Sequence, residues 1–564
     1  MLPTAFVRRL KRGVPRIILL VLAGLANGTC AADDEVGSKA CGGCHREIYR
    51  KYSAGSMSQS SGIAGSGGFR ESFERAVFSD PASGAEYRLS PSPEGIRLDF
   101  KRSAAGTRIL GWFTGSGRVA RSYLSSSDGF LFQSPVSYYS AGAKWDLSPG
   151  YRQHDSVHLT RAVGTGCLQC HASRLQPAAG TQNGFGPQPF LEGGVSCERC
   201  HGPGKNHVTG MASGKGAGSA TIVNPAKLEP ARRDSVCAQC HLTGAARVAR
   251  PPSKARAKGN YQAGELLPDY ATYFVWSGSA SGLLSANSHF EKLAGSSCKK
   301  AGGDRLWCGS CHDAHGEPAE AARVEFYRSR CRKCHEPQAC KGGGPARQKV
   351  QDDCTACHMP KSRIRDTEHA VFTDHSIPRR ERPAAAGPEA ALDGGLDKKL
   401  TLMSFWKTPV DDRDLGLGYV TVAGADSALR RQAFELLRKA EIRDPSDVLV
   451  LSQLAQLHDQ SGNESAAMAL SERVVRLDPA QVAVAVNLGT YYIKRGRARE
   501  AMRLWTDALA RSPGLTSVRM NLAVAQYQTG DAAAAEATLL KAIEYDPDRE
   551  TVRQLLSEIR AGRR

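Results

Sequence analysis

Fourteen of the 17 cysteines fall into one repeated pattern, Cys-x-x-Cys-His. The seven copies are Cys41, Cys44 and His45; Cys167, Cys170 and His171; Cys197, Cys200 and His201; Cys237, Cys240 and His241; Cys308, Cys311 and His312; Cys331, Cys334 and His335; and Cys354, Cys357 and His358. Composition alone predicts only about 0.01 copies, so the repetition is not accidental. Two thiols at this spacing can form thioethers with the two vinyl groups of one haem, and the adjacent histidine can bind the iron. The pattern predicts seven covalently bound c-type haems.

Other uses of paired cysteines fit the sequence less well. Zinc sites also use Cys-x-x-Cys pairs, but they do not require a histidine after every pair. A disulfide framework gives no reason for the fixed histidine. Cys298 and Cys340 lie outside the motifs, and either a disulfide between them or two free thiols fits the sequence.

The remaining histidines supply candidates for the second axial ligand of each iron. One of the eight, His458, lies in the helical C-terminal region, and we expect it to pack there. The other seven match the number of predicted haems: His154, His158, His207, His289, His315, His369 and His375. One distal histidine per iron would give an electron carrier without an open coordination site. Met57, which follows His45, is a competing ligand for the first haem, since Met/His ligation also occurs in c-type cytochromes.

The spacing of the motifs indicates which parts of the chain surround them. A gap of 123 residues separates Cys44 from Cys167, whereas the later motifs follow at short steps. Within the gap Ile96, Leu98 and Phe100 alternate, as in a half-buried strand. We therefore predict a multidomain chain in which residues 33–380 form a haem-packed region of low regular secondary structure, with a β-rich insert at about 70–140.

A different pattern begins after residue 412. Pro445, Pro479, Pro513 and Pro547 recur at intervals of 34 residues, the period of tetratricopeptide repeats. Small residues such as Gly489 and Ala501, with large ones such as Trp505, fit the packing of such helices. We predict an all-α solenoid over 413–562, made of one degenerate and three full repeats plus a capping helix. Its concave face would bind a protein or peptide partner.

The N-terminal 32 residues predict export. Five basic residues precede a short apolar run, Ile17 to Ala26, and small residues follow it, as in a signal peptide. The apolar run is too short to span a bilayer readily, although an uncleaved anchor is the alternative. A periplasmic location in a Gram-negative bacterium would follow. Residues 381–412, rich in Pro, Ala and Gly near their start, are predicted to be a linker.

The formal net charge of +19 first suggests nucleic-acid binding. Acidic and basic residues balance over 411–564, however, so outside the signal the excess belongs to the region that carries the motifs. Haem propionates are anionic and would offset much of it. We therefore predict no nucleic-acid partner, and contact with a membrane only through partners or an uncleaved anchor.

Several segments resemble cytochrome c-554-like multihaem proteins. They are Gly37 to Ala40 with Glu47 to Tyr49; Gly194 to Ser196 with His201 to Gly204 and His207; Cys357 to Lys361 with His369; and Thr373 to His375. With the repeats appended, the chain resembles bacterial multihaem c-type cytochromes that end in tetratricopeptide domains. This resemblance implies a haem-packed fold, periplasmic electron transfer, and distal ligation by His207 and His375.

Two functions follow as hypotheses. The first is an electron carrier with seven haems whose helical domain docks a redox partner or holds an assembly together. The alternative is a multihaem oxidoreductase acting on a small nitrogen or sulfur compound, of the nitrite or hydroxylamine type, at one open-coordinate haem. Whether the protein is an enzyme stays undecided at this point, and no catalytic residue is assigned.

Overall fold

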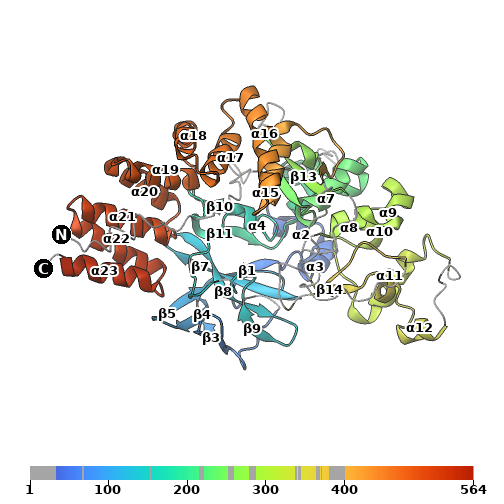
Figure 1. Cartoon of the computed structure of the whole chain (residues 1–564). Coiled ribbons are helices and arrows are strands. Elements are labelled where there is room, and N and C mark those ends of the chain that lie inside the picture. Colours follow the sequence, from blue (N-terminus) through green and yellow to red (C-terminus); the bar gives the residue numbers. More distant parts are fainter. Residues whose placement is uncertain are drawn as a thin grey trace.

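The computed structural model describes residues 34–562 except 67–68, 153, 215–220, 252–259, 278–287, 337–339, 341–343, 364–368, 370 and 380–400. The predicted signal peptide and residues 381–400 of the predicted linker lie outside the described residues. Within the described part, no helix is long and apolar enough to cross a membrane. A mixed β region is followed by a C-terminal run of helices, as expected (Figure 1).

Two antiparallel sheets form the β-rich insert, which extends beyond the predicted range. The first sheet contains, in order, β2 (Val77–Asp80), β3 (Ala85–Ser92), β4 (Gly95–Lys101) and β5 (Ala105–Leu110). The second contains β1 (Ser61–Ile63), β6 (Trp112–Thr114), β7 (Ala120–Ser127), β8 (Phe130–Tyr139) and β9 (Lys144–Leu147). Ile96, Leu98 and Phe100 on β4 are all buried, because alternate residues of a strand face the same side. They belong to the core shared by the two sheets.

Short helices and small sheets make up the region of the motifs, which has more regular structure than predicted. The helices are α2 (Ser38–Gly42), α3 (Arg46–Ser53), α4 (Thr165–Leu168), α5 (Cys197–His201), α6 (Lys205–Ala212), α7 (Pro230–His241), α8 (His289–Gly295), α9 (Ser297–Gly302), α10 (Cys308–Cys311), α11 (Arg323–Cys331), α12 (Gly344–Lys349) and α13 (Cys354–His358). Short 3₁₀ helices span Pro225–Lys227, Leu267–Asp269, Gly303–Arg305 and Glu320–Ala322. The sheets are β10 (Ala172–Pro177) with β11 (Phe185–Gly193), β14 (Lys361–Arg363) with β15 (Val371–Thr373), and a sheet of β12 (Ala246–Ala249), β13 (Ala271–Trp276) and β16 (Leu402–Ser404).

Nine helices fill residues 412–562, all of which are described. They are α15 (Asp412–Ala423), α16 (Ser427–Arg443), α17 (Val448–Gln460), α18 (Glu464–Leu477), α19 (Val482–Lys494), α20 (Ala498–Arg511), α21 (Thr516–Gln528), α22 (Ala532–Tyr545) and α23 (Glu550–Gly562). The second helix of each pair ends two residues before a repeated proline, since the residue before proline disfavours helical backbone. A Cβ atom on Gly489 would lie 2.4 Å from the Trp505 indole nitrogen, so only glycine allows this approach of α19 and α20.

The helical run contacts the rest of the chain at both of its ends. At its start, β16 pairs with β13 and α15 packs on β12, so residues 402–404, inside the range predicted as linker, belong to a sheet. At its other end, Asp548 is fully buried against the loop between β4 and β5. Figure 1 shows the helices curving from α15, beside β13, to α21–α23 beside β5 and β7.

Candidate functional site

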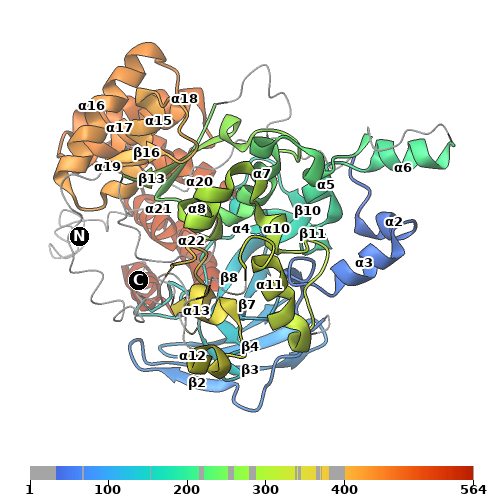
Figure 2. The same cartoon turned by 90° about the vertical axis from the view of Figure 1, so that its right-hand side faces the viewer.

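Residues of all seven Cys-x-x-Cys-His motifs line one cavity of about 4440 Å³. Every motif histidine lines it, and so does every motif cysteine except Cys167. A pocket for one small molecule measures about 300–1,000 Å³, so this cavity has room for several cofactors. Figure 2 shows the motif-bearing helices α5, α7, α10, α11 and α13 grouped together, with β2–β4 below them and α16–α19 to one side.

Local helical structure turns the functional atoms of a motif toward the same side. Four motifs lie in helices, α5, α7, α10 and α13, or at their ends. Residues three and four apart share a helix face, so both cysteines and the following histidine point the same way. This is the arrangement needed to attach a planar cofactor at two points and bind its metal at a third.

Two motif histidines are held so that Nε2 is free to bind a metal. Nδ1–H of His201 donates to the carbonyl oxygen of Val223 at 2.7 Å, and Nδ1–H of His358 donates to that of Pro378 at 2.9 Å. A ring nitrogen facing a carbonyl must carry the proton, which leaves Nε2 as the base. Metal-bound histidines commonly make such a bond, which orients the ring.

Burial favours the neutral, metal-binding form of four other histidines at the cavity, His171, His241, His289 and His312. Desolvation lowers the pKa values of His171 and His241 below the usual value near 6.5. Desolvation together with the nearby His375 and His241 lowers the pKa of His312 to about 4. For His289, desolvation and the neighbouring His375 lower the pKa to about 3. Neutral imidazole is the ligating form, so these rings need not lose a proton to bind iron near pH 7.

Three candidate distal histidines lie next to motif histidines that are distant in the sequence. The rings of His201 and His315 are 5.9 Å apart between centroids and 9° from parallel. Those of His312 and His375 are 6.1 Å apart at 23°, and those of His241 and His289 are 5.4 Å apart at 83°. Two imidazoles on opposite sides of one metal, each bound at ~2 Å, have centroids about 6 Å apart.

Two of these candidates also have ring nitrogens suited to ligation. Nδ1–H of His375 donates to the carbonyl of Thr373 at 3.0 Å, which leaves its Nε2 free. Nδ1 of His289 is buried without a hydrogen-bond partner in the structure. A fourth candidate, His207 on α6, lines the cavity too, with Nδ1 3.4 Å from the hydroxyl of Thr221.

The other three histidine candidates are not among the described residues that line the cavity. His154 and His158 stack on each other at 4.4 Å and contact Tyr151. Nε2 of His369 lies 2.7 Å from a carboxylate oxygen of Asp146, and its ring contacts Tyr139. Nε2 of His369 is therefore paired with a carboxylate in this structure and does not face the cavity. The ring of His458, in contrast, packs edge-on against Phe434 within the helical run.

Apolar side chains that the protein itself leaves exposed line the cavity near the first and third motifs. Met57, Ile48, Val208 and Met211 are between 37% and 54% exposed. Exposed apolar side chains gathered in one place usually mark a surface that a ligand covers. A porphyrin face would cover them, so the residues present fit the cofactor. Met57 remains a candidate ligand, since its thioether belongs to this group.

Two half-buried arginines at the cavity have a buried Nε–H donor that no protein group accepts. The Nε atoms of Arg199 and Arg330 are buried and have no hydrogen-bond partner in the structure. A buried unsatisfied donor costs roughly 1–3 kcal/mol, so an acceptor is expected there. Haem carries two propionates that can accept such bonds. No sequence pattern distinguishes these two arginines from the many others, because the choice depends on burial.

Sulfur contacts show which motifs are neighbours in space. The thiol of Cys41 lies beside that of Cys197, and Cys170 lies beside Cys240. Cys237 lies beside Cys308, and Cys331 beside Cys354. The first motif is thus adjacent to the third, the second to the fourth, the fourth to the fifth, and the sixth to the seventh. The order in space differs from the order in the sequence.

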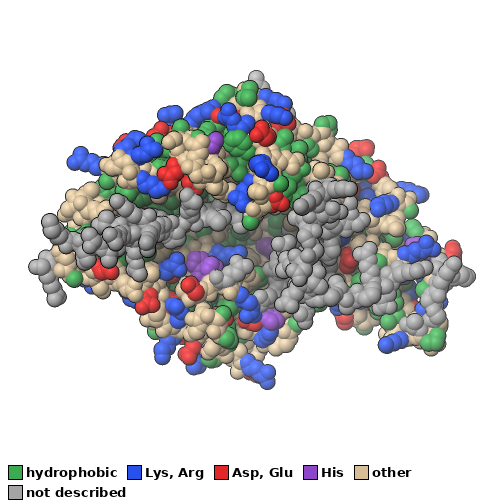
Figure 3. All heavy atoms as spheres, viewed as in Figure 1, with side chains coloured by type: hydrophobic (Ala, Val, Ile, Leu, Met, Phe, Trp, Pro, Cys, Tyr) green, Lys and Arg blue, Asp and Glu red, His purple; other side chains and the backbone are tan. Residues whose placement is uncertain are grey.

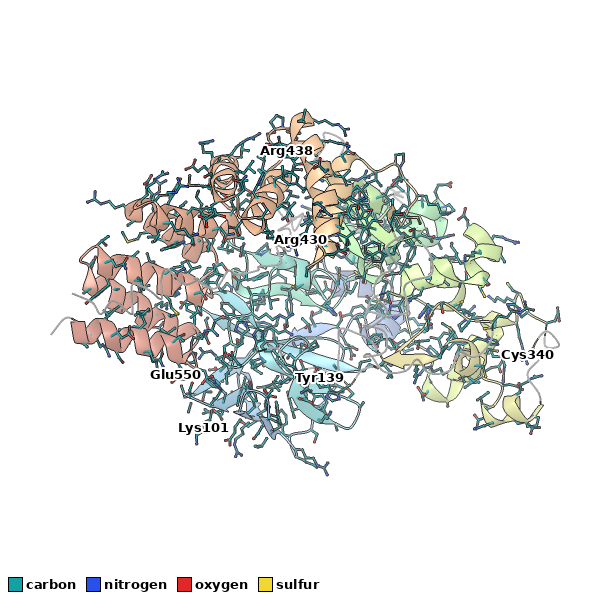
Figure 4. All side chains as sticks on the ribbon, in the orientation of Figure 1. Lys101, Tyr139, Cys340, Arg430, Arg438 and Glu550 are labelled. Atoms are coloured by element: carbon teal, nitrogen blue, oxygen red, sulfur yellow. The ribbon has the colours of Figure 1, made fainter. Side chains whose placement is uncertain are left out.

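Cys298 and Cys340, the two described cysteines outside the motifs, carry free thiols in the structure. Cys298 is half-buried on α9, whereas Cys340 is exposed. Figure 4 places Cys340 at the edge of the molecule. The structure thus has free thiols, one of the two states that the sequence left open.

Charged side chains do not gather into one patch on the face seen in Figure 3. Lys and Arg are spread over its described surface, with Asp and Glu among them.

Comparison with protein families supports the two parts of the chain separately. Residues 143–202 match the family "cytochrome c554 and c-prime", a range that includes the second and third motifs. Residues 492–559 match the tetratricopeptide repeat. The first match implies haem c as cofactor, and the second implies protein–protein interaction. No curated protein matches the chain.

The similar solved structures include several of a protein named MamA. The structure named MamA AMB-1 is 25% identical, covering 26% of this chain and 78% of that one, with a TM-score of 0.24. The MamA RS-1 ArsTM double mutant is 16% identical, covering 28% and 87%, with a TM-score of 0.26.

Proposed function

We propose that this protein is a periplasmic multihaem c-type cytochrome that carries electrons through seven covalently bound haems. Its helical C-terminal part would dock a redox partner or hold an assembly together. The observation that carries the proposal is the single large cavity lined by all seven motif histidines and by all but one of the motif cysteines. A zinc or disulfide protein has no use for so large a common cavity.

When bound, haem supplies one-electron chemistry at its iron, with a potential set by axial ligands, burial and nearby charge. The cysteine thiols would attach the cofactor, and the motif histidines would bind its metal through Nε2. The carbonyls of Val223 and Pro378 hold two of these rings in orientation. Arg199 and Arg330 would donate to propionates, and the apolar side chains exclude water.

Histidines distant in the sequence complete three of the iron sites in this proposal. His315 would bind opposite His201, His375 opposite His312, and His289 opposite His241, as their ring separations suit. His207, on α6, is a further distal candidate. Cys237 also lies near Cys200, and Cys331 near Cys311, which link the third motif to the fourth and the fifth to the sixth. Electrons would therefore pass from the first motif to the third and fourth, then to the fifth, sixth and seventh, with the second motif joined to the fourth.

The domain limits are also part of the proposal. We assign residues 1–32 to a signal peptide, 33–380 to the cytochrome region, 381–412 to a connecting segment, and 413–562 to the tetratricopeptide domain. The attachment of α15 and of Asp548 to the cytochrome region supports a solenoid held in a fixed orientation. A protein or peptide on its concave face would then be held in a fixed position relative to the haems.

One observation favours the alternative, a multihaem oxidoreductase acting on a small nitrogen or sulfur compound. Seven motif histidines line the cavity, but only His207, His289, His315 and His375 of the distal histidine candidates do so. An iron without a second ligand could bind a small molecule. The electron carrier remains the primary proposal, because Met57 and movement of further histidines on cofactor binding could fill the remaining positions.

The test uses protein matured in a host that attaches haem c. A pyridine haemochrome assay with intact-mass measurement should give seven haems per chain, and the oxidised protein should give only low-spin EPR signals. Absence of covalent haem would contradict both functions. A high-spin signal that shifts on addition of nitrite or hydroxylamine would replace the carrier by the oxidoreductase. The Cys331→Ala and Cys334→Ala double variant, which should lose one haem, calibrates the count.

A further inference from the structure

The side chain of Glu198, between the two cysteines of the third motif, is buried where three chain segments meet. It is only 5% exposed. Its carboxylate accepts the backbone N–H groups of Val36 at 2.8 Å, Gly37 at 2.8 Å and Gly204 at 2.7 Å. Val36 and Gly37 lead into the first motif, and Gly204 precedes α6, which carries His207.

Further contacts hold the first motif against the third at this point. The hydroxyl of Ser38 accepts the backbone N–H of Cys197 at 3.0 Å, and the sulfurs of Cys41 and Cys197 lie side by side. The hydroxyl of Tyr52 donates to the carbonyl of Val195 at 2.7 Å. Glu198 therefore lies at the junction of the two motifs.

The surroundings of Glu198 fit a carboxylate rather than a carboxylic acid. All three hydrogen-bond partners are donors, and a carboxylate is an acceptor only. Within the described part of the chain, no lysine or arginine forms a salt bridge with it. The carboxylate is thus held by backbone N–H groups and not by a salt bridge, and the charged side chains around it are those of Glu35, Glu192, Arg174 and Arg199.

We propose that Glu198 is a positioning residue that also lowers the reduction potentials of the haems attached at the first and third motifs. This inference rests on the proposed function, because it needs haem at those motifs. A buried negative charge near an iron favours the ferric state, which carries one more positive charge than the ferrous state. The haems at the first and third motifs, at one end of the proposed electron path, would therefore be easier to oxidise.

The test compares Glu198→Gln with the unaltered haem-loaded protein by spectroelectrochemical titration. Glutamine keeps the size of the side chain and removes its charge. We expect unchanged haem content and a positive shift in one or two midpoint potentials, on the order of tenfold in the ferric-to-ferrous ratio, or ~59 mV for one electron. Glu198→Asp, which keeps the charge, should shift them less. Glu320→Gln is the control, because Glu320 also lines the cavity but its side chain is 82% exposed.

Unchanged potentials in Glu198→Gln with full haem content would overturn the inference and leave the proposed function intact. If that variant does not accumulate, Glu192→Gln provides the charge test. The carboxylate of Glu192 accepts the N–H of Ser38 at 3.2 Å. Its negative charge, like that of Glu198, contributes to raising the pKa of the Cys41 thiol. Its removal should give a smaller positive shift, and no shift would overturn the inference. Lack of haem in the unaltered protein would instead contradict the proposed function.

Discussion

The imidazole rings of His201 and His315 lie 5.9 Å apart between centroids, with planes only 9° from parallel. His201 follows the cysteines of the third motif, whereas His315 follows the fifth motif. His315 is too close in sequence to His312 to bind opposite it readily, so the distal ligand of one motif would come from the segment after another. If so, the iron site of the third motif depends on the segment that follows the fifth motif.

We predict that His315→Ala converts one haem per chain from low spin to high spin. Loss of the distal imidazole leaves that iron five-coordinate or water-bound. EPR and near-infrared magnetic circular dichroism of the oxidised protein measure the change, with the haem count unaltered. His458→Ala, which changes a histidine in the helical run, is the matched control and should leave the spectra as they are. Unchanged spin states in His315→Ala would contradict the ligand assignment.

A second prediction separates two histidines that are close in the sequence. His375 lines the cavity with Nε2 free, whereas Nε2 of His369 faces Asp146 at 2.7 Å. We therefore expect His375→Ala to produce a high-spin haem and His369→Ala to leave every haem low-spin. The same EPR measurement decides between them. A high-spin signal in His369→Ala would mean that this side chain leaves Asp146 when haem binds.

A third prediction concerns the attachment of the helical run. The carboxylate of Asp548 is fully buried and accepts the N–H groups of Ser103 at 2.9 Å, Ala104 at 3.1 Å and Val157 at 3.1 Å. It also forms a salt bridge with Arg102. Removing it leaves buried donors unpaired, so Asp548→Ala should lower the free energy of unfolding by about 2–4 kcal/mol.

Denaturant unfolding measures this loss, and Ser446→Ala is the control. Ser446 follows Pro445 as Asp548 follows Pro547, but it lies exposed at the start of the helical run. It should change stability by less than about 0.5 kcal/mol. Equal effects of the two substitutions would show that the buried contact of Asp548 does not hold the two regions together.

The C-terminal helices and the candidate site differ in how far the sequence could predict them. The repeated prolines located the helices closely, because each repeat packs mainly on its neighbours in the chain. The close packing expected of Gly489 is confirmed by its approach to Trp505. These contacts join helices that are adjacent in the chain, so the 34-residue sequence period can predict them.

The partners of the candidate distal histidines depend on contacts between segments that are far apart in the chain, and no local sequence pattern predicts such contacts. Counting distal candidates could not reveal that His369 faces Asp146 or that His154 stacks on His158. Glu198 has no distinguishing signal in the sequence either. Its role depends on burial and on the N–H groups of Val36 and Gly37, which lie far from it in the chain. The motif cysteines could be proposed as haem-attachment residues from the sequence alone, because each motif lies within five consecutive residues.

A fourth prediction concerns the pH dependence of stability. Asp546 is 2% exposed and its Oδ1 atom has no partner, so burial raises its pKa above the usual value, against the opposing effects of Arg549 and Thr516. The folded state then binds its proton more tightly than the unfolded state. Stability from this group is present below pH ~4 and is lost as the pH rises through the folded pKa. In Asp546→Asn this loss should disappear.

Urea unfolding between pH 4 and 7 tests the sign. Relative to the unaltered protein, Asp546→Asn should gain stability as the pH rises. Asp444 stands at the equivalent position before Pro445, but the Ser446 hydroxyl and N–H lower its pKa. With the series extended to about pH 2, Asp444→Asn should show the opposite trend, because the unaltered side chain loses its contribution only as the pH falls below ~4 through its lowered folded pKa. The same trend in both variants would contradict the role of burial.

The fifth prediction concerns Cys298 and Cys340, which carry free thiols. In haem-loaded protein without its predicted signal segment, the motif cysteines are consumed as thioethers, so a maleimide should label two thiols without reductant. Cys340 is exposed and should react quickly. Burial and the nearby Cys334 raise the pKa of Cys298, so its thiolate is scarcer and its labelling slower. Cys340→Ser should remove only the fast phase, as followed by intact mass. Labelling that requires prior reduction would instead mean that the two cysteines form a disulfide, whose Cα atoms must lie within about 7 Å of each other.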